Sequence, residues 1–279
     1  MKNSVTIRCG KWEAEILPEI GANPIRLTYD GADVLRPLPD LDVLKINPFL
    51  WGSPILIPAN RTDGGRFVFE GKEYRLPLNE AALNNNLHGM MYTLTFPTEK
   101  TAENEAVSCY ENKGEAYPFP FRLTVTATLT EDAFTRRFAI TNTGTGAMPF
   151  TFALHTTFVE AFVRVPLGLA HRRNERHIPL YYGELTADEQ ALCDGLDPHG
   201  KRYSGYYTMA GHTAEIGAFD WCASDNFDHW ILYNNDGEQG YFCIEPQAGR
   251  SNGLNDGGFH RLAPGETEVF TTSLKRSRV

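Results

Sequence analysis

Two histidines and one glutamate of this chain lie in apolar stretches where the side chains of strands are normally hydrophobic. His88 lies in NNLHGMMYTLTF, His155 in FTFALHTTFVE and Glu245 in GYFCIEPQAG. A buried glutamate is rare unless it has a partner or a chemical task. Two imidazoles and one carboxylate are sufficient for acid–base catalysis, so these three residues are the first candidates for a functional site.

Each of the three residues also has a purely structural interpretation. A histidine in a strand is more often a satisfied core residue than a catalyst, and a buried Glu245 could instead anchor a loop through an ion pair with Arg250. The basic segment HRRNERH, residues 171–177, is most simply a solvated loop, although it could also hold a phosphate. The remaining histidines that we considered receive structural assignments: His212, His229 and His260.

The overall composition limits the function further. The chain has 279 residues, of which 42% are hydrophobic and 12% aromatic, so it can bury a large core. Its net charge is −9, from 26 basic and 35 acidic residues, which argues against a nucleic-acid partner and against an anionic membrane surface. A small neutral or polar molecule is therefore the expected ligand.

Cysteines and standard motifs argue against several other classes of protein. The five cysteines include no C-x-x-C pair, which argues against a disulfide framework and a cysteine-based zinc site. The sequence has no apolar signal segment and no window long enough to span a membrane, so we expect a cytoplasmic protein. Glycine motifs for nucleotides, the G-x-S-x-G elbow and the H-E-x-x-H pair are absent, and we predict no cofactor and no metal.

Short runs with the two-residue period of β-strands follow one another along the chain. In FRLTVTATLT, residues 121–130, the apolar residues alternate, which predicts a strand that covers a core with one face. Turn pairs predict hairpins at three places: Asp30-Gly31, Glu70-Gly71 and Asp236-Gly237. The sequence therefore predicts an all-β, antiparallel fold, organised as a single domain over residues 1–279.

Helices are expected to be few and short. One is predicted in TADEQALCDG, where Thr186 is the N-cap, Glu189 completes a capping box and Gly195 follows the end. Residues 165–211 have mixed polarity and no long strand pattern. We expect this stretch to be an excursion from the sandwich that could wall a cleft.

The segment that begins at Asn47 carries the most specific pattern of the chain. It reads NPFLWGSPILIPANRTDGGRFVFEGKEYRLPLNEAALNNNLHG and contains Asn60-Arg61, a glycine turn, two strand patterns and Leu87-His88-Gly89. This segment resembles the aldose 1-epimerase (galactose mutarotase-like) family, which has the pattern N-R…G-x-F-x-F-x-G-x-x-Y-x-L…L-H-G. The resemblance implies a large antiparallel β-sandwich, and an isomerase that opens the pyranose ring of a free sugar and lets it reclose as the other anomer.

The resemblance extends over roughly residues 5 to 277. The run LHTTF at residues 154–158 matches a second family histidine, although the family often has H-P-Y-F or H-x-Y-F, so this chain departs from it at two positions. The run IEPQ at residues 244–247 matches the E-P segment of the family, and RLAPGETEVFTTSL matches its closing L-x-P-G-E strand.

The resemblance implies a role for each candidate residue. Interconversion of anomers takes a proton from the C1 hydroxyl and gives one to the ring oxygen O5, so it needs a base and an acid. By resemblance, Glu245 is the base and His155 the acid, while His88 and Arg61 hydrogen-bond the sugar. Further substrate-binding candidates are Asn60, Asp228 (with Asp220 and Asp225 as alternatives for an acid that contacts the distal hydroxyls), Trp51 and Trp230, with Phe158 and Trp221 as weaker aromatic candidates.

Three other functions use the same residue types. A related branch of the fold acts on hexose 6-phosphates and would need an arginine cluster, for which the candidates are Arg26, Arg172, Arg173 and Arg176. A non-catalytic carbohydrate-binding protein would keep the cleft, although binding alone needs no desolvated glutamate. A zinc hydrolase would use His88, His155 and Glu245 as ligands, but they include no short-spaced pair. We therefore expect an epimerase of a free aldose, as a monomer or homodimer.

Overall fold

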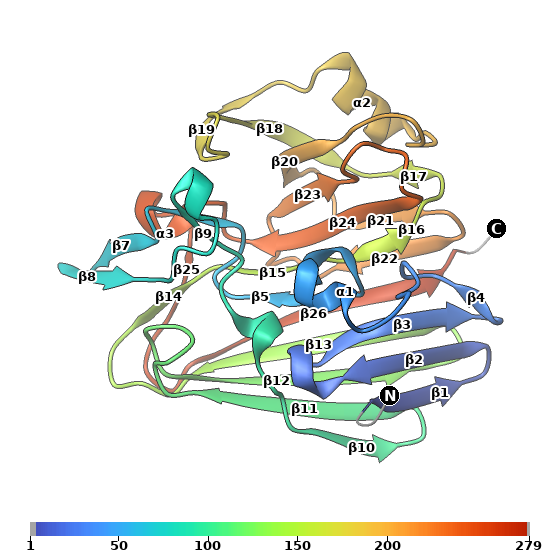
Figure 1. The fold of residues 1–279 in the computed structure, drawn as a ribbon, viewed down its shortest axis with the longest axis horizontal. Coiled ribbons are helices and arrows are strands. Elements are labelled where there is room, and N and C mark those ends of the chain that lie inside the picture. Colours follow the sequence, from blue (N-terminus) through green and yellow to red (C-terminus); the bar gives the residue numbers. More distant parts are fainter. Residues whose placement is uncertain (1–3, 278–279) are drawn as a thin grey trace.

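The computed structural model describes residues 4–277 and shows a strand-rich architecture (Figure 1). Two eight-stranded antiparallel sheets form most of it. The first has the order β10 (Thr98–Ala102), β11 (Glu105–Asn112), β12 (Phe121–Leu129), β13 (Ala133–Asn142), β26 (Thr267–Arg276), β22 (Phe219–Ala223), β21 (Thr213–Ile216) and β17 (Val163–Arg164). The second has the order β19 (Pro179–Gly183), β18 (Leu167–Arg173), β20 (Ser204–Met209), β23 (His229–Tyr233), β24 (Tyr241–Ala248), β15 (Phe152–Leu154) and β5 (Ile55–Leu56), with β16 (Thr157–Val159) also paired to β24.

Smaller sheets and short helices complete the fold. A four-stranded sheet comprises β1 (Val5–Cys9), β2 (Trp12–Leu17), β3 (Asn23–Tyr29) and β4 (Ala32–Asp33). The two-stranded ribbons are β14 (Met148–Phe150) with β25 (His260–Leu262), β6 (Arg61–Asp63) with β9 (Asn85–Leu87), and β7 (Arg66–Phe69) with β8 (Lys72–Arg75). The α-helices in residues 4–277 are α1 (Val43–Ile46), α2 (Ala187–Asp194) and α3 (Gly253–Asp256). None of the helices in this range is long and apolar enough to cross a membrane.

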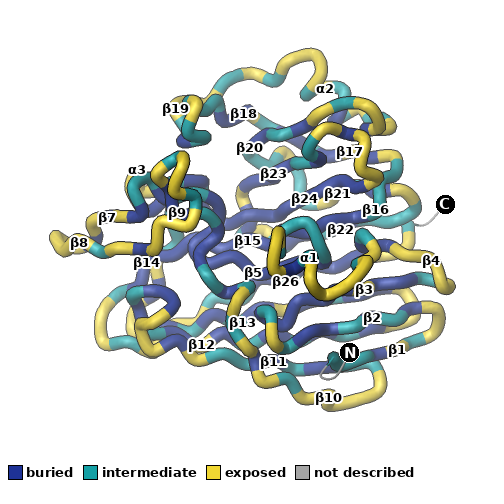
Figure 2. Tube along the Cα trace, in the orientation of Figure 1, coloured by how far each residue is buried: buried dark blue, intermediate teal, exposed yellow. Residues whose placement is uncertain are grey.

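Aromatic side chains from both large sheets meet in the core between them. Phe152 of β15 lies with its ring centroid 5.2 Å from that of Phe138 on β13 and 4.8 Å from that of Phe270 on β26. All three side chains are fully buried. Figure 2 shows buried residues along the central strands, while the turns and the outer hairpin β7–β8 are more exposed. The two sheets therefore pack face to face around a shared aromatic core.

The predicted all-β class with few short helices is confirmed, and so are several local predictions. The three predicted turns join β3 to β4, β7 to β8 and β23 to β24. Helix α2 begins at the predicted N-cap, because the Thr186 hydroxyl accepts from the Glu189 amide and the Glu189 carboxylate accepts from the Thr186 amide. Gly195 is its C-cap, as predicted.

The prediction of an irregular excursion at residues 165–211 is wrong in its secondary structure. This stretch contributes three strands, β18, β19 and β20, to the edge region of the second large sheet. Their sequence pattern is weak because β18 and β20 have a shifted register, with paired residues Leu167↔Met209 and Ala170↔Tyr207. A register shift interrupts the two-residue alternation by which strands are recognised in a sequence.

Candidate active site

Strand β24 carries Glu245 through the middle of the second sheet. All eight of its residues are buried, and Cys243, Glu245 and Gln247 lie on one face because strand side chains alternate. Strand β23 pairs with one edge of β24, with Ile231 opposite Glu245, while β15 and β16 share the other edge. Glu245 is therefore fixed by neighbours on both sides.

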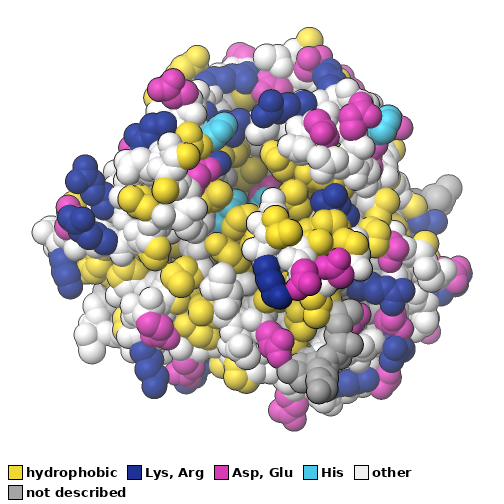
Figure 3. Space-filling model, viewed as in Figure 1, with side chains coloured by type: hydrophobic (Ala, Val, Ile, Leu, Met, Phe, Trp, Pro, Cys, Tyr) yellow, Lys and Arg dark blue, Asp and Glu magenta, His cyan; other side chains and the backbone are white. Residues whose placement is uncertain are grey.

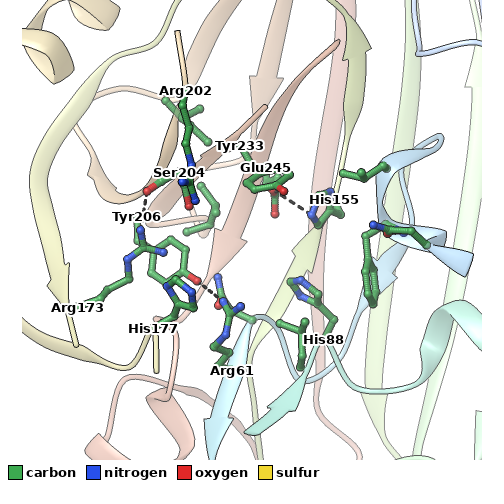
Figure 4. A pocket seen from close by; sticks show the side chains of 17 residues that line it. Arg61, His88, His155, Arg173, His177, Arg202, Ser204, Tyr206, Tyr233 and Glu245 are labelled. Atoms are coloured by element: carbon green, nitrogen blue, oxygen red, sulfur yellow. Dashed lines mark hydrogen bonds and ion pairs between the residues drawn. The ribbon is translucent and has the colours of Figure 1, made fainter. Parts of the chain in front are cut away.

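His155 occupies the short break between β15 and β16. Strand β15 pairs with Gln247 and Ala248, and β16 pairs with residues 241–243, so the break between them lies beside Glu245. The His155 amide donates to the Pro54 carbonyl, with a distance of 3.0 Å. The break turns the imidazole toward the carboxylate, and His155 Nε2 lies 3.3 Å from Glu245 Oε1 (Figure 4).

A tight turn after β9 brings His88 to the same place. The His88 amide donates to the Asn60 carbonyl at 2.7 Å, and both residues have left-handed backbones, with φ of 64° and 57°. Gly89 follows, and a Cβ there would lie 2.0 Å from the Ile57 carbonyl oxygen, so only glycine fits. This contact gives a structural reason for the L-H-G sequence.

These three residues line one cavity of about 280 Å³. The cavity is open to solvent and appears in Figure 3 as a hollow with histidine and acidic side chains inside. Its volume is close to the lower end of the range for small-molecule sites, which suits one small polar ligand. Arg61 and Asn60 also line it, so five of the predicted site residues come together here.

Burial shifts the pKa values of the central pair in opposite directions. Removal from water raises the pKa of the Glu245 carboxyl well above its ordinary value, and the nearby positive charge of Arg61 opposes part of this shift. Removal from water lowers the pKa of the His155 imidazole to about 3. Both shifts favour the uncharged form, in which the pair holds one transferable proton and has no net charge.

His88 is packed among aromatic rings at the edge of this pair. Its ring centroid lies 4.6 Å from that of Phe49 and 5.4 Å from that of His155. Burial lowers the pKa of His88 well below its usual range, and the neighbouring His155 and Arg61 lower it further. A neutral imidazole can donate one hydrogen bond and accept one, which suits contacts with sugar hydroxyls.

Arg61 is held by two side-chain partners. Its Nε and one terminal nitrogen donate to the two oxygens of Glu80, at 2.8 and 2.7 Å. Its other terminal nitrogen donates to the Tyr206 hydroxyl at 2.5 Å. The carboxylate of Glu80 also accepts from Asn85, and these contacts hold the pKa of Glu80 below its usual range. The guanidinium is therefore fixed at the cavity wall.

The side of the cavity away from the two catalytic histidine candidates is cationic and polar. Its wall contains Arg173 at the end of β18, His177 in the following turn, and Arg202, Ser204 and Tyr206 at or near the start of β20. Figure 4 shows Arg173 and Arg202 on the far side of Glu245 from His88 and His155. The cavity thus has a buried proton-transfer end and a cationic end.

Three predicted substrate-binding residues do not line the cavity. Asp228 accepts a hydrogen bond from His229 Nδ1 at 2.6 Å, outside the cavity wall. Trp230 is fully buried, and its indole nitrogen donates to the Gly211 carbonyl. Trp51 packs against the Arg36 guanidinium, which lies 3.9 Å from its ring. The aromatic side chains that do line the cavity are Phe49, Tyr206 and Tyr233, none of which is among the predicted site residues.

The structure also decides between several alternative interpretations of charged residues. Arg250 pairs with Asp256 at 2.9 Å, so His155, rather than Arg250, is the partner of Glu245. Residues 171–177 are not the solvated loop that we expected. Their first residue, His171, is buried, and Arg173 and His177 line the cavity.

One group of side chains has the donor atoms that a metal ion would need. The ligand atoms of His155, Cys243 and Glu245 lie within 4.8 Å of one another. This set differs from the trio considered for a zinc hydrolase, because Cys243 takes the place of His88. Burial raises the pKa of the Cys243 thiol well above its ordinary value, so a metal would have to displace a tightly held proton.

Comparison with known proteins places the chain in a family. A family profile described as aldose 1-epimerase matches residues 4–162. This chain belongs to the aldose 1-epimerase family. The resemblance expected from the motifs is thereby confirmed.

Solved structures show how widely this epimerase fold is shared. A galactose mutarotase-like protein from Clostridium acetobutylicum superposes with a TM-score of 0.90 at 20% identity, over 99% of this chain and 95% of that one. A GalM/aldose epimerase homologue from C. elegans superposes with a TM-score of 0.82 at 15% identity, over 99% of both chains. At such identities the likeness establishes the fold alone.

Two curated relatives from Escherichia coli (strain K12) match parts of this aldose epimerase family member. The uncharacterized protein YihR is 26% identical over 54% of this chain and 49% of its own length. The uncharacterized protein YphB is 30% identical over 38% of this chain and 36% of its own length. The matches thus span half or less of the curated relatives.

Proposed function

We propose that this protein is an aldose 1-epimerase that interconverts the α and β anomers of a sugar by acid–base ring opening and reclosure. The 3.3 Å contact between His155 Nε2 and Glu245 Oε1 inside the cavity carries this proposal. The two oxygens that exchange protons, O1 and O5, are bonded to the same carbon. An acid and a base that serve both must therefore be immediate neighbours, as these two are.

The pair holds the one transferable proton that this chemistry requires. At rest the pair holds one proton, and transfer of that proton from Glu245 to His155 gives a carboxylate and an imidazolium without a change in net charge. Glu245 then takes the proton of the O1 hydroxyl while His155 gives a proton to O5. The C1–O5 bond breaks and C1 and O1 form a carbonyl, so protons and electrons balance.

Reclosure reverses these transfers after rotation about the C1–C2 bond. The O5 hydroxyl adds to the other face of the carbonyl, His155 recovers its proton and Glu245 returns one to O1. The positive charge of Arg61 favours the carboxylate form of Glu245, since it lowers the pKa of that residue. His88 and Asn60, at the cavity wall, are the proposed partners of the sugar hydroxyls.

Polarimetry of freshly dissolved sugars tests this proposal. We expect the protein to accelerate the approach of α-glucose or α-galactose, or of their acidic derivatives, to anomeric equilibrium. A folded protein that accelerates none of them would contradict it. A protein that binds a sugar without accelerating its mutarotation would instead be a carbohydrate-binding protein of this family.

A cytoplasmic location remains part of the proposal. All five cysteines are free thiols in this structure, as is common in a reducing compartment. Cell fractionation with an antibody against the protein tests this point.

A further inference from the structure

The cationic end of the cavity is positively charged although the protein as a whole is acidic. The chain carries a net charge of −9, yet Arg61, Arg173 and Arg202 all line one cavity. Among the described residues that line it, Glu245 is the sole carboxylate, and burial favours its neutral form. The free cavity is therefore a local concentration of positive charge in an acidic protein.

Two of these arginines have no acidic partner among the described residues. Arg61 is paired with Glu80, and on the neighbouring segment Arg172 is paired with Glu189 and Arg176 with Asp63. By contrast, Arg173 and Arg202 form no ion pair with a carboxylate within residues 4–277. Uncompensated guanidinium groups that line a cavity are suited to an anionic ligand.

Arg173 is oriented by two neighbours, although none of the residues in the described part of the chain gives it an acidic partner. It donates to the Ser204 carbonyl at 2.5 Å, and its guanidinium lies 4.0 Å from the centroid of the Tyr206 ring. A side chain fixed in this way loses less conformational entropy when a ligand binds. The site for an anion is thus partly formed before the ligand arrives.

The strand register places this cationic group at a suitable distance from Glu245. Glu245 is opposite Ile231 on β23, and Ile231 is opposite Tyr206 on β20. Tyr206 is therefore two strand spacings, or about 10 Å, from Glu245 along the sheet. Strand β18 with Arg173 lies next to β20. A pyranose with its anomeric carbon at Glu245 would direct its farthest carbon toward these arginines.

We propose that the sugar bound here carries an anionic group, a phosphate or a carboxylate, on its terminal carbon, and that Arg173 and Arg202 bind this group. This inference rests on the proposed epimerase function. Of the arginines that the sequence suggested for such a role, only Arg173 lines the cavity, while Arg202 is the unexpected second member. His177 and Ser204, at the same wall, are available as additional hydrogen-bonding groups.

Mutarotation rates of matched sugars test the inference. We expect kcat/KM for glucose 6-phosphate, glucuronate or both to exceed that for glucose at least tenfold, and the preferred acid identifies the anionic group. Equal kcat/KM values, or a preference for glucose, would overturn the inference. The same comparison with galactose and its acidic derivatives guards against a mismatch in hydroxyl stereochemistry.

Single substitutions assign the effect to the two arginines. We expect Arg173→Gln and Arg202→Gln each to lower kcat/KM for the acidic sugar about ten- to hundredfold more than that for glucose, as expected for loss of a charge-assisted contact. Arg137→Gln, at an exposed position on β13 of the other sheet, removes the same charge and should change neither value. Losses of equal size for acidic and neutral sugars would contradict a role in anion binding.

Calorimetric titration separates this inference from the proposed reaction. If the wild-type protein binds glucose 6-phosphate or glucuronate more tightly than glucose, and the arginine variants lose that preference, the anion site stands even without any acceleration. If mutarotation is accelerated but binding shows no preference for the acidic sugars, the reaction stands and the anion site is wrong.

Discussion

The two ends of the cavity achieve their chemistry by opposite means. At the proton-transfer end, His155 and Glu245 are almost completely buried and lie 3.3 Å apart. At the cationic end, Arg202 is exposed and Arg173 is partly exposed, and neither forms an ion pair with a carboxylate of the described residues 4–277. Burial makes charge costly at one end, whereas exposure to water allows it at the other.

This difference assigns a separate task to each end. Two groups that are uncharged at rest exchange protons best in a dry environment. There, a small change in hydration shifts the pKa values of both groups strongly. Guanidinium groups that solvent can reach are suited to capturing an anion. They remain hydrated in the free protein, so their desolvation costs little free energy until the ligand is bound. Substitutions at the two ends should therefore affect different kinetic quantities.

The largest effect is expected at the proton-transfer end. Glu245→Gln and His155→Asn each remove one member of the acid–base pair, and we expect kcat to fall by about 10²- to 10⁴-fold with little change in sugar affinity. Polarimetry and calorimetric titration measure the two quantities. Glu99→Gln, on the exposed face of β10, is the matched control and should behave like the wild type. Equal losses in rate and affinity would mean that these residues bind rather than catalyse.

Removal of Arg61 is expected to have the next largest effect, mainly on stability. Arg61→Gln leaves Glu80 without its main partner in a partly buried site, and we expect unfolding free energy to fall by about 3 kcal/mol. Urea denaturation followed by fluorescence measures the loss. The exposed pair of Arg164 and Glu215 is the control, because Arg164→Gln should cost about 1 kcal/mol or less. Similar losses for both variants would show that burial of the Arg61 pair is unimportant.

Stability should also depend on pH through the two members of the buried pair. The folded pKa of His155 is lowered to about 3, so the unfolded chain binds more protons and stability is lost as the pH falls below about 6.5. The folded pKa of Glu245 is raised, so stability is lost as the pH rises above its ordinary value near 4.5. Each slope is at most about 1.4 kcal/mol per pH unit.

Denaturation of variants across pH separates these two contributions. Compared with wild type, His155→Asn should lose less stability on acidification, and Glu245→Gln should lose less as the pH rises. Parallel curves for all three proteins would mean that neither group is titrated differently in the folded state.

A smaller effect is expected from salt at the cationic end. Raising the ionic strength from about 50 to about 500 mM should lower kcat/KM for an acidic sugar several-fold, because salt screens exposed charges more than buried ones. The rate at saturating sugar should change much less. If salt lowered kcat/KM for glucose by the same factor, the effect would arise outside the cationic end.

Metal removal should have the smallest effect. Dialysis against a chelator is expected to leave the mutarotation rate unchanged, because the Cys243 thiol is kept protonated by burial. Elemental analysis before and after dialysis provides the control. Loss of activity that zinc restores would indicate that His155, Cys243 and Glu245 act as ligands.

The sequence was a good guide to the proton-transfer end and a poor one to the cationic end. His88, His155 and Glu245 are recognisable in the sequence because a polar residue within an apolar run is unusual, and all three line the cavity. The fold class followed from alternation that is clear in strands such as β12. Both signals depend on residues close together in the chain.

The cationic end had no comparable local signal. Arg202 lies outside any apolar run, and its place beside the cavity depends on the pairing of β20 with β23, which the sequence does not specify. Residue type alone favours Asp228 and Trp230 as sugar contacts, whereas in the structure Trp230 lies in the core and Asp228 binds His229. Long-range register, rather than residue type, decides which side chains reach the cavity.

The position of the cationic end in the second sheet has a consequence for how proteins of this fold diverge in evolution. Strands β19, β18 and β20 form one margin of this sheet, whereas Glu245 is carried by β24 nearer its middle. Replacements at the margin disturb few neighbours, while replacements on β24 disturb many. A lineage with this fold could thus exchange one sugar for another by altering the margin, and inherit the ring-opening machinery unchanged.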